Sequence, residues 1–155
     1  MARKHRTVNG VTPLVVLSMA VGVSAGEPPA NSMTVVYNHV SAESGADLMP
    51  AGGFSAAVRF NGQTILFDTG GERGPLLHNL QELKLDPAQL DAIVISHNHW
   101  DHVYGLPGVA YAAGENLPVY VPDSAQEGLR QQNPRANIVA VEKAIGIAPG
   151  VWVVG

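Results

Sequence analysis

Residues 54–67, FSAAVRFNGQTILF, constrain the fold of this chain more than any other stretch. Apolar side chains stand at alternate positions from Phe54 to Phe60, which predicts a strand with one apolar face. The pair Asn61-Gly62 follows, and it is a strong signal for a two-residue hairpin turn. We therefore expect two antiparallel strands, at 54–60 and 63–67, joined by this turn.

Beyond this hairpin, the chain alternates apolar runs with turn-forming segments. The run 92–96, AIVIS, is continuously apolar, which is typical of a strand buried on both faces. Leucines at helical spacing follow Pro75 and predict an amphipathic helix over 75–84. The other predicted elements are strands at 33–39, 117–121, 137–141 and 151–154, a helix at 124–132, and a loop over 103–116. Strands that come first, followed by alternating helix and strand, predict a mixed α/β fold in layers (an α+β layered arrangement).

The N-terminus has the three-part pattern of a secretory signal peptide. Basic residues lie between Arg3 and Arg6, a short apolar run follows from Val11 to Val23, and small residues lead up to Ala25. The apolar run is shorter than the about 20 residues that a membrane-spanning helix needs. We therefore expect a protein exported to the periplasm or secreted, with a disordered or membrane-anchored N-terminus as the alternative. The predicted segments are a signal peptide at 1–25, a leader at 26–32 and a globular domain at 33–155.

The charge balance of the chain bears on its partners. Cleavage of the signal peptide would remove the three positive charges of Arg3, Lys4 and Arg6 and change the formal net charge from −4 to −7. An acidic surface repels phosphate backbones, so we expect a small-molecule substrate and no nucleic acid partner. We also expect no membrane attachment after cleavage. The sequence has no cysteine, so any metal must be held by histidine, aspartate, glutamate or water.

The stretch 96–102, SHNHWDH, has the highest density of metal-ligand side chains in the sequence. His97, His99 and Asp101 occupy alternate positions, so an extended chain would point them to the same side. His102 breaks this alternation, points elsewhere, and would pair with Asp101 on a second ion. Neutral imidazole is a good zinc ligand, and mixed histidine and carboxylate ligands also suit iron or manganese. We interpret the motif as ligands for two metal ions, with a histidine-rich surface loop that binds no metal as the alternative.

Two motifs together resemble those of the metallo-β-lactamase superfamily. HNHWDH (97–102) matches its His-x-His-x-Asp-His signature, and ILFDTG (65–70) is similar to its Asp-Thr-Gly turn. From about Phe54 to Leu106, the chain resembles the dihydropterin-aminobenzene-phosphate synthase-like subgroup. It departs from that subgroup at Asn98, where glycine is usual, and at Tyr104-Gly105, where a glycine pair is usual. The resemblance implies an αββα fold, of which this chain would be the N-terminal half.

The resemblance also implies a role for each site residue. His97 and His99 would hold the first metal, and Asp101 and His102 the second. Asp101 would be catalytic as well, because it would orient the bridging hydroxide and handle its proton. Asp68 would support the site from behind, since ligand histidines need an acceptor for their other N–H group. The alternative for Asp68 is a purely turn-forming aspartate.

The ligand set of the family is larger than the one this sequence carries. The family completes the first metal site with a third histidine downstream, and the second with a bridging aspartate and a final histidine. No histidine follows His102 here, so we predict that the chain is the N-terminal half of a longer fold. The expected function is an exported, metal-dependent hydrolase that uses a zinc-bridged hydroxide on an ester, lactone, amide or phosphoester. The alternatives are a non-catalytic metal-binding protein or inactive remnant, and a transferase like the one for which the subgroup is named.

Overall fold

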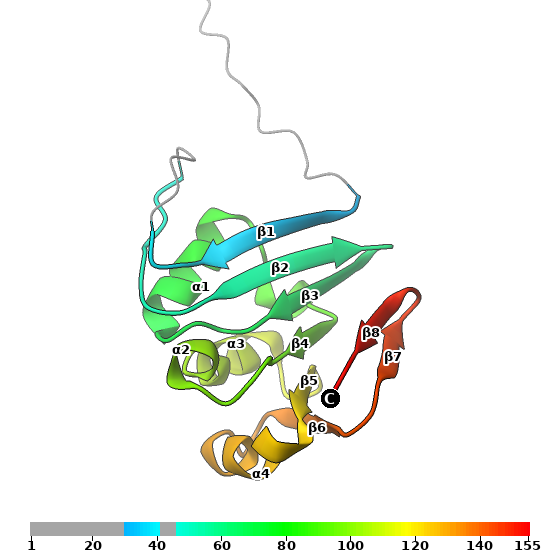
Figure 1. The fold of residues 1–155 in the computed structure, drawn as a ribbon. Helices are drawn as coiled ribbons and strands as arrows, with labels where there is room; N and C mark the ends of the chain where they lie inside the picture. Colours follow the sequence, from blue (N-terminus) through cyan, green and yellow to red (C-terminus); the bar gives the residue numbers. More distant parts are fainter. Residues whose placement is uncertain (1–29, 41–45) are drawn as a thin grey trace, which may run out of the picture.

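A six-stranded sheet forms the centre of the protein, in a computed structural model that describes residues 30–40 and 46–155 (Figure 1). Neighbouring strands follow chain order across the sheet. The first three strands are antiparallel, and the third to sixth are parallel. The strands are β1 (Ser32–Tyr37), β2 (Ser55–Phe60), β3 (Gln63–Phe67), β4 (Ala92–Val94), β5 (Pro118–Pro122) and β6 (Asn137–Val141).

The predicted hairpin is present and has the geometry that its turn residues favour. Asn61 and Gly62 both have positive φ angles, 50° and 80°, as a two-residue turn with the twist of the strands requires. Phe60 pairs with Gln63 across the turn, and the register continues without a bulge along β2 and β3. The turn therefore sets which residues of these two strands face each side of the sheet.

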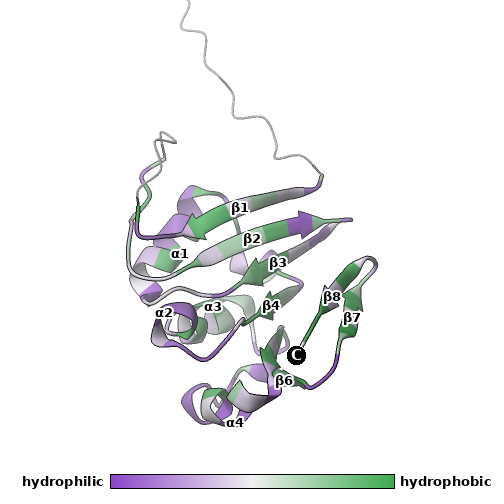
Figure 2. Ribbon diagram, in the orientation of Figure 1, coloured by the Kyte–Doolittle hydropathy of each residue, from purple (hydrophilic) through white to green (hydrophobic). Residues whose placement is uncertain are grey.

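Helices connect the parallel strands and cover one face of the sheet. Parallel neighbours need a crossover connection, because the chain must return to the same end of the sheet before the next strand. The hydrophobic core joins strand residues such as Leu66 and Ile93 to helix residues such as Leu76 and Leu129. In Figure 2 apolar residues run along the strands, whereas the helices mix apolar and hydrophilic residues. The helices are α1 (Arg73–Glu82), a 3₁₀ helix η1 (Pro87–Gln89), α2 (Trp100–Val103), α3 (Leu106–Ala113) and α4 (Asp123–Gln132).

A second, separate hairpin lies over the other face of the sheet. It consists of β7 (Ile145–Ala148) and β8 (Val151–Val153) and lies beside β4–β6 in Figure 1. Residues 151–154 and sheet residues that include Ile65 and Phe67 line one cavity of about 370 Å³. The helices and this hairpin therefore lie on opposite sides of the sheet, which is a layered arrangement.

The α/β fold class predicted from the sequence is confirmed, and some local predictions need correction. The segment predicted as a loop at 103–116 contains helix α3, and β7 was not expected. The helix predicted at 75–84 begins earlier, at Arg73, and ends at Glu82. Helix α3 forms in spite of Gly108 because Leu106 and Val109 are fully buried in the core. Tertiary packing there outweighs the turn-forming composition of the segment.

The N-terminal predictions fall largely on residues outside the described part of the chain. The predicted signal peptide at 1–25 lies entirely outside it, and β1 begins at Ser32, the last residue of the predicted leader. Across residues 30–40 and 46–155, none of the helices has the length and apolarity to cross a membrane.

Candidate metal centre

The histidine motif lies at the carboxyl end of β4, next to the end of β3. These two strands are parallel, with Phe67 opposite Val94, so they end at the same edge of the sheet. The backbone N–H of Asp68 donates to the carbonyl of Val94 at 2.8 Å and extends this pairing by one residue. Because the strands are in register, Asp68 comes beside Ser96, the first residue of the motif.

Asp68 is buried and accepts hydrogen bonds from two different parts of the motif. Its Oδ1 accepts from the backbone N–H of Ser96, and its Oδ2 accepts from the Ser96 hydroxyl, both at 2.7 Å. The same Oδ2 lies 2.7 Å from His102 Nδ1. A carboxylate can only accept, so His102 donates through Nδ1–H and keeps the lone pair of Nε2 free. The buried side chain of Asp68 therefore sets the tautomer of His102.

Ser96 extends this effect to His97. Its single hydroxyl proton is donated to Asp68, so its oxygen accepts from His97 Nδ1, which lies 2.8 Å away. His97 then also keeps the lone pair of Nε2 free. Asp68 thus supports His102 directly and His97 through Ser96, as outer partners of metal-binding histidines commonly do.

The motif bends into a helix at Trp100, which corrects the expectation of an extended chain through Asp101. His99 is the last extended residue, with φ −99° and ψ 146°, and α2 begins directly after it. A helical turn rotates successive side chains by about 100°. His102 therefore returns toward His97, with ring centroids 4.2 Å apart, whereas strict alternation would have pointed it elsewhere.

The four predicted ligands lie together at this edge of the sheet. The rings of His97 and His99 have centroids 4.4 Å apart in an edge-to-face arrangement. His102 Nε2 lies 3.6 Å from Asp101 Oδ2, and the Asp101 side chain is 31% exposed. Metal binding by these four residues stays a prediction, which their closeness supports.

The donor set fits a divalent metal in its chemistry but is not complete. Imidazole nitrogens with free lone pairs and a carboxylate are ligands that suit zinc or iron. Within the described residues, however, no three histidine, aspartate or glutamate side chains are arranged to hold one metal ion together. The rings of His97 and His99, and of His97 and His102, have centroids 4.4 and 4.2 Å apart. The centre therefore supplies part of a coordination shell.

The turn at 68–71 holds α2 in place. The backbone N–H and the hydroxyl of Thr69 both donate to the carbonyl of His102, each at 2.8 Å. Asp68 and Gly70 have positive φ angles, 55° and 64°, so the chain bends sharply around these contacts. The Asp-Thr-Gly turn therefore positions the backbone of the motif as well as the side chains of its histidines.

Tyr37, at the end of β1, packs beneath this turn. A Cβ atom at Gly70 would lie 2.7 Å from the Tyr37 ring, so only glycine fits there. Burial raises the pKa of the Tyr37 hydroxyl above 10.0, and the nearby Glu72 carboxylate raises it further. The backbone N–H groups of Gly71 and Glu72 lower this pKa by a smaller amount. Those N–H groups are close, but they do not have hydrogen-bond geometry, and the hydroxyl has no partner within the described residues. Tyr37 is therefore a neutral, apolar support for the turn.

Two residues of the centre, Ser96 and Thr69, do not follow from the sequence pattern. Ser96 directly precedes the first histidine and follows a buried strand, which was an available signal. The partner of its hydroxyl is 28 positions away in the chain, and local patterns do not show such a pairing. Thr69 was seen as part of a turn, but its contact with His102 depends on how the two loops pack.

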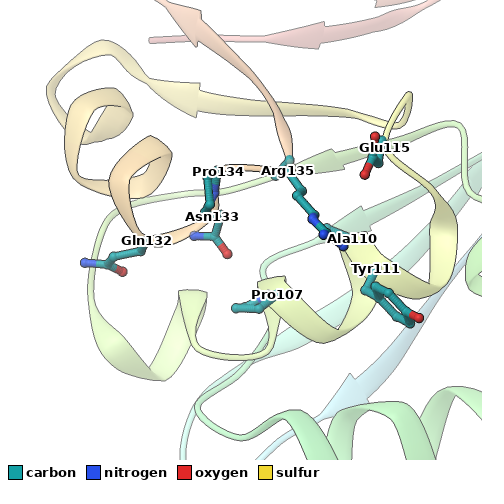
Figure 3. Close-up of a pocket in the computed structure, with 9 residues that line it drawn as sticks. Pro107, Ala110, Tyr111, Glu115, Gln132, Asn133, Pro134 and Arg135 are labelled. Carbon is teal, nitrogen blue, oxygen red and sulfur yellow. The ribbon is translucent and has the colours of Figure 1, made fainter.

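A separate cavity of about 290 Å³ lies between α3 and the turn that leads into β6 (Figure 3). None of the predicted site residues lines it. Its lining residues are Pro107, Ala110, Tyr111, Glu115, Gln132, Asn133, Pro134, Arg135 and Ala136. The cavity is therefore distinct from the candidate metal centre.

Comparison with known proteins identifies the family to which this chain belongs. A family model described as the metallo-beta-lactamase superfamily matches residues 49–147. The 7,8-dihydropterin-6-methyl-4-(beta-D-ribofuranosyl)-aminobenzene-5'-phosphate synthase of Methanocaldococcus jannaschii is 38% identical over 69 residues, which cover 43% of this chain and 24% of that protein. Ribonuclease Z of Nanoarchaeum equitans is 40% identical over 55 residues, which cover 36% of this chain and 16% of that protein. Among solved structures, the metallo-β-lactamase fold protein YhfI of Bacillus subtilis has a TM-score of 0.54 and 20% sequence identity, over 76% of this chain and 50% of that one.

The family match covers more than half of the chain, so the chain belongs to the metallo-β-lactamase superfamily. This confirms the resemblance that the two sequence motifs carry, including the similarity to the dihydropterin synthase-like member. Proteins of this fold generally bind divalent metal ions, zinc or iron, and the superfamily includes hydrolases such as ribonucleases. The chain spans half or less of the length of each relative named above.

Proposed function

We propose that this protein is the metal-binding part of a hydrolase that cleaves an ester, lactone, amide or phosphoester. The observation that carries the proposal is the position of Asp68 behind the motif. Its carboxylate holds His102 directly and His97 through Ser96, so that both imidazoles keep Nε2 free. This arrangement argues against a histidine-rich surface loop that binds no metal, because such a loop would function without a buried carboxylate that sets the tautomers of His97 and His102.

His97 and His99 would hold one metal ion, and Asp101 and His102 a second. Zinc is the metal we favour, and iron or manganese also suits these ligands. When bound, the metal would supply hydroxide near neutral pH, because it lowers the pKa of coordinated water, and it would polarise the bond to be cleaved. Asp101 is partly exposed beside His102 Nε2, and it would take a proton from the attacking water.

The names of the relatives bear on the substrate. One relative is a ribonuclease, and another is a synthase whose name contains a ribofuranosyl phosphate group. Both names favour a phosphoester among the four candidate bonds. We also propose export to the periplasm or outside the cell, which rests on the basic start and short apolar run of the first 25 residues.

The test is zinc-dependent turnover of a panel of p-nitrophenyl esters, p-nitrophenyl phosphodiesters and a chromogenic lactam by the protein translated from its whole reading frame, because residues 30–40 and 46–155 supply only part of the coordination shell. We expect turnover of at least one substrate, lost on addition of a chelator and reduced at least about 100-fold in His97→Ala. His78→Gln is the matched control, because His78 lies on α1 and bonds to the Asp47 carbonyl. Turnover that persists in His97→Ala, or that is unchanged by the chelator, would refute the proposal.

A second candidate is a metal-binding protein without catalysis. The absence of any three-ligand group within residues 30–40 and 46–155 favours it. This candidate predicts zinc binding that depends on His97 and Asp68, with no turnover across the same panel. The titration of zinc and the turnover assay together separate the two candidates.

A further inference from the structure

Two aromatic side chains stand in solvent at the metal centre. Trp100 and Tyr104 are four positions apart, at the start and at the C-terminal cap of α2, so they lie on the same side of that turn. The two residues are 54% and 57% exposed, and their ring centroids are 6.2 Å apart with planes at 59°. Exposed indole surface is unfavourable in water, so an aromatic pair at this position needs a reason.

The backbone beneath Trp100 holds the indole in one place. A Cβ at Gly71 would lie 2.6 Å from Trp100 Cζ3, and a Cβ at Gly52 would lie 3.2 Å from Trp100 Cη2. The six-membered ring therefore lies directly against two glycines. The N–H of Gly71 donates to the carbonyl of Gly52 at 3.2 Å, which joins the two segments under the ring. One side of the indole is thus packed on the main chain, and the rest of the ring is available.

This surface and the candidate metal centre share the helical turn α2. Trp100 lies between His99 and Asp101 in the chain. The backbone N–H of Phe54 donates to the carbonyl of Asp101 at 3.2 Å, which joins α2 to the segment before β2. The imidazole of His39 also comes to this spot, since its Cε1 lies 3.5 Å from the Cβ position of Gly52. The indole therefore belongs to the same helical turn as the predicted ligands Asp101 and His102.

We propose that Trp100 and Tyr104 form a binding subsite for a planar aromatic or heteroaromatic ring of the substrate. The ring would stack on the available part of the Trp100 indole, and the bond to be cleaved would extend toward the histidines. Stacking on an aromatic side chain accepts any flat ring and adds about tenfold or more to affinity. This inference rests on the proposed function and narrows its substrate to esters or phosphoesters that carry such a ring.

The first test measures binding without turnover. The sequence has two tryptophans, so Trp152→Phe leaves Trp100 as the single fluorescent indole. Zinc-loaded Trp152→Phe protein is titrated with adenosine 5′-monophosphate, which has a planar base, and with ribose 5-phosphate, which lacks it. We expect saturable quenching by the first, with a dissociation constant at least about tenfold below that of the second in competition. Equal affinity for the two compounds would overturn the proposal.

Substitutions of Trp100 test whether the aromatic ring of the ligand binds on the indole. Trp100→Leu keeps an apolar side chain without an aromatic face, and equilibrium dialysis should show at least about tenfold weaker binding of adenosine 5′-monophosphate. Trp100→Phe should recover most of that affinity. The control is Tyr111→Ala, because Tyr111 is exposed on α3 and lines the separate cavity of Figure 3. If Tyr111→Ala weakens binding and Trp100→Leu does not, the ring binds in that cavity and the proposal is wrong.

The fluorescence and turnover experiments distinguish an error in the subsite proposal from an error in the hydrolase proposal. Quenching that depends on Trp100, with no turnover of any substrate, supports the subsite and contradicts the hydrolase. Turnover with equal kcat/KM for methyl p-nitrophenyl phosphate in the original and Trp100→Leu proteins supports the hydrolase and contradicts the subsite.

Discussion

Asp68 and His102 are 34 positions apart in the chain, yet Asp68 Oδ2 lies 2.7 Å from His102 Nδ1. The contact joins the turn after β3 to helix α2, and the Asp68 side chain is only 1% exposed. A single buried carboxylate therefore links the strand edge to the predicted ligands.

Asp68→Asn should weaken zinc binding about 10- to 100-fold, the usual effect of losing an outer partner of ligand histidines. The asparagine NH₂ group would donate to His102 Nδ1 where the carboxylate oxygen accepted. The imidazole proton would then move to Nε2, the nitrogen that must stay free for the metal. Zinc affinity is measured by competition with a chromophoric chelator.

Asp123→Asn is the control for this measurement, since Asp123 is exposed in the first turn of α4 and touches no predicted ligand. Its zinc affinity should equal that of the original chain. If Asp68→Asn binds zinc as tightly as Asp123→Asn does, the supporting role of Asp68 is excluded.

Ser96→Ala should weaken zinc binding less than Asp68→Asn does. It removes the hydroxyl between Asp68 and His97 but leaves the direct contact of Asp68 with His102. Nitrogen NMR of the histidine rings should show His97 losing its single tautomer while His102 keeps its own. Ser96→Thr retains a hydroxyl and should behave like the original chain; a mixed His97 tautomer in that variant would argue against the relay.

Gly70→Ala should destabilise the protein by about 2–5 kcal/mol. Alanine at φ 64° costs about 1–2 kcal/mol, and its Cβ would overlap the Tyr37 ring at 2.7 Å, which adds about 1–3 kcal/mol. Urea denaturation followed by circular dichroism measures the change.

Gly74→Ala is the matched control for Gly70→Ala. Gly74 lies in the first turn of α1, and a Cβ there meets no atom within 4 Å. This substitution should stabilise the protein by up to about 1 kcal/mol, because alanine favours helix. Equal effects of the two substitutions would show that the Tyr37 contact does not limit position 70.

Tyr37→Phe should change the response of stability to high pH. The pKa of Tyr37 is raised above 10.0 in the folded protein, so above pH 10 the unfolded state loses its proton first. The unfolded state then binds fewer protons, and the free energy of unfolding falls as the pH rises, by up to about 1.4 kcal/mol per pH unit.

In Tyr37→Phe this loss at high pH should be absent. At pH 7 the substitution should be neutral or slightly stabilising, since the buried hydroxyl has no hydrogen-bond partner among the described residues. Urea denaturation at pH 7 and above pH 10 measures both effects. An identical fall in stability above pH 10 in the two proteins would rule out Tyr37 as its source.

Much of the fold could be predicted from local sequence because local rules govern it. The Asn61-Gly62 turn and the strands on either side follow from turn chemistry and alternation, and β3 and β6 begin and end where they were predicted. Helix α3 could not be predicted, because its sequence contains proline and glycine and its stability comes from burial of Leu106 and Val109. Packing against other elements decides such a segment.

The sequence by itself determined the class of protein, and it predicts which side chains hold metal. A run of histidines and an aspartate after a buried strand, with an Asp-Thr-Gly turn before it, carries the resemblance to the superfamily and the prediction of the ligands. The tertiary structure decided how these side chains are arranged. The helical turn at Trp100 brings His102 to His97, and the parallel register of β3 and β4 places Asp68 behind them. The physical reason is that residue type and spacing act along the chain, whereas tautomers and ring positions depend on partners that only folding brings within hydrogen-bond distance.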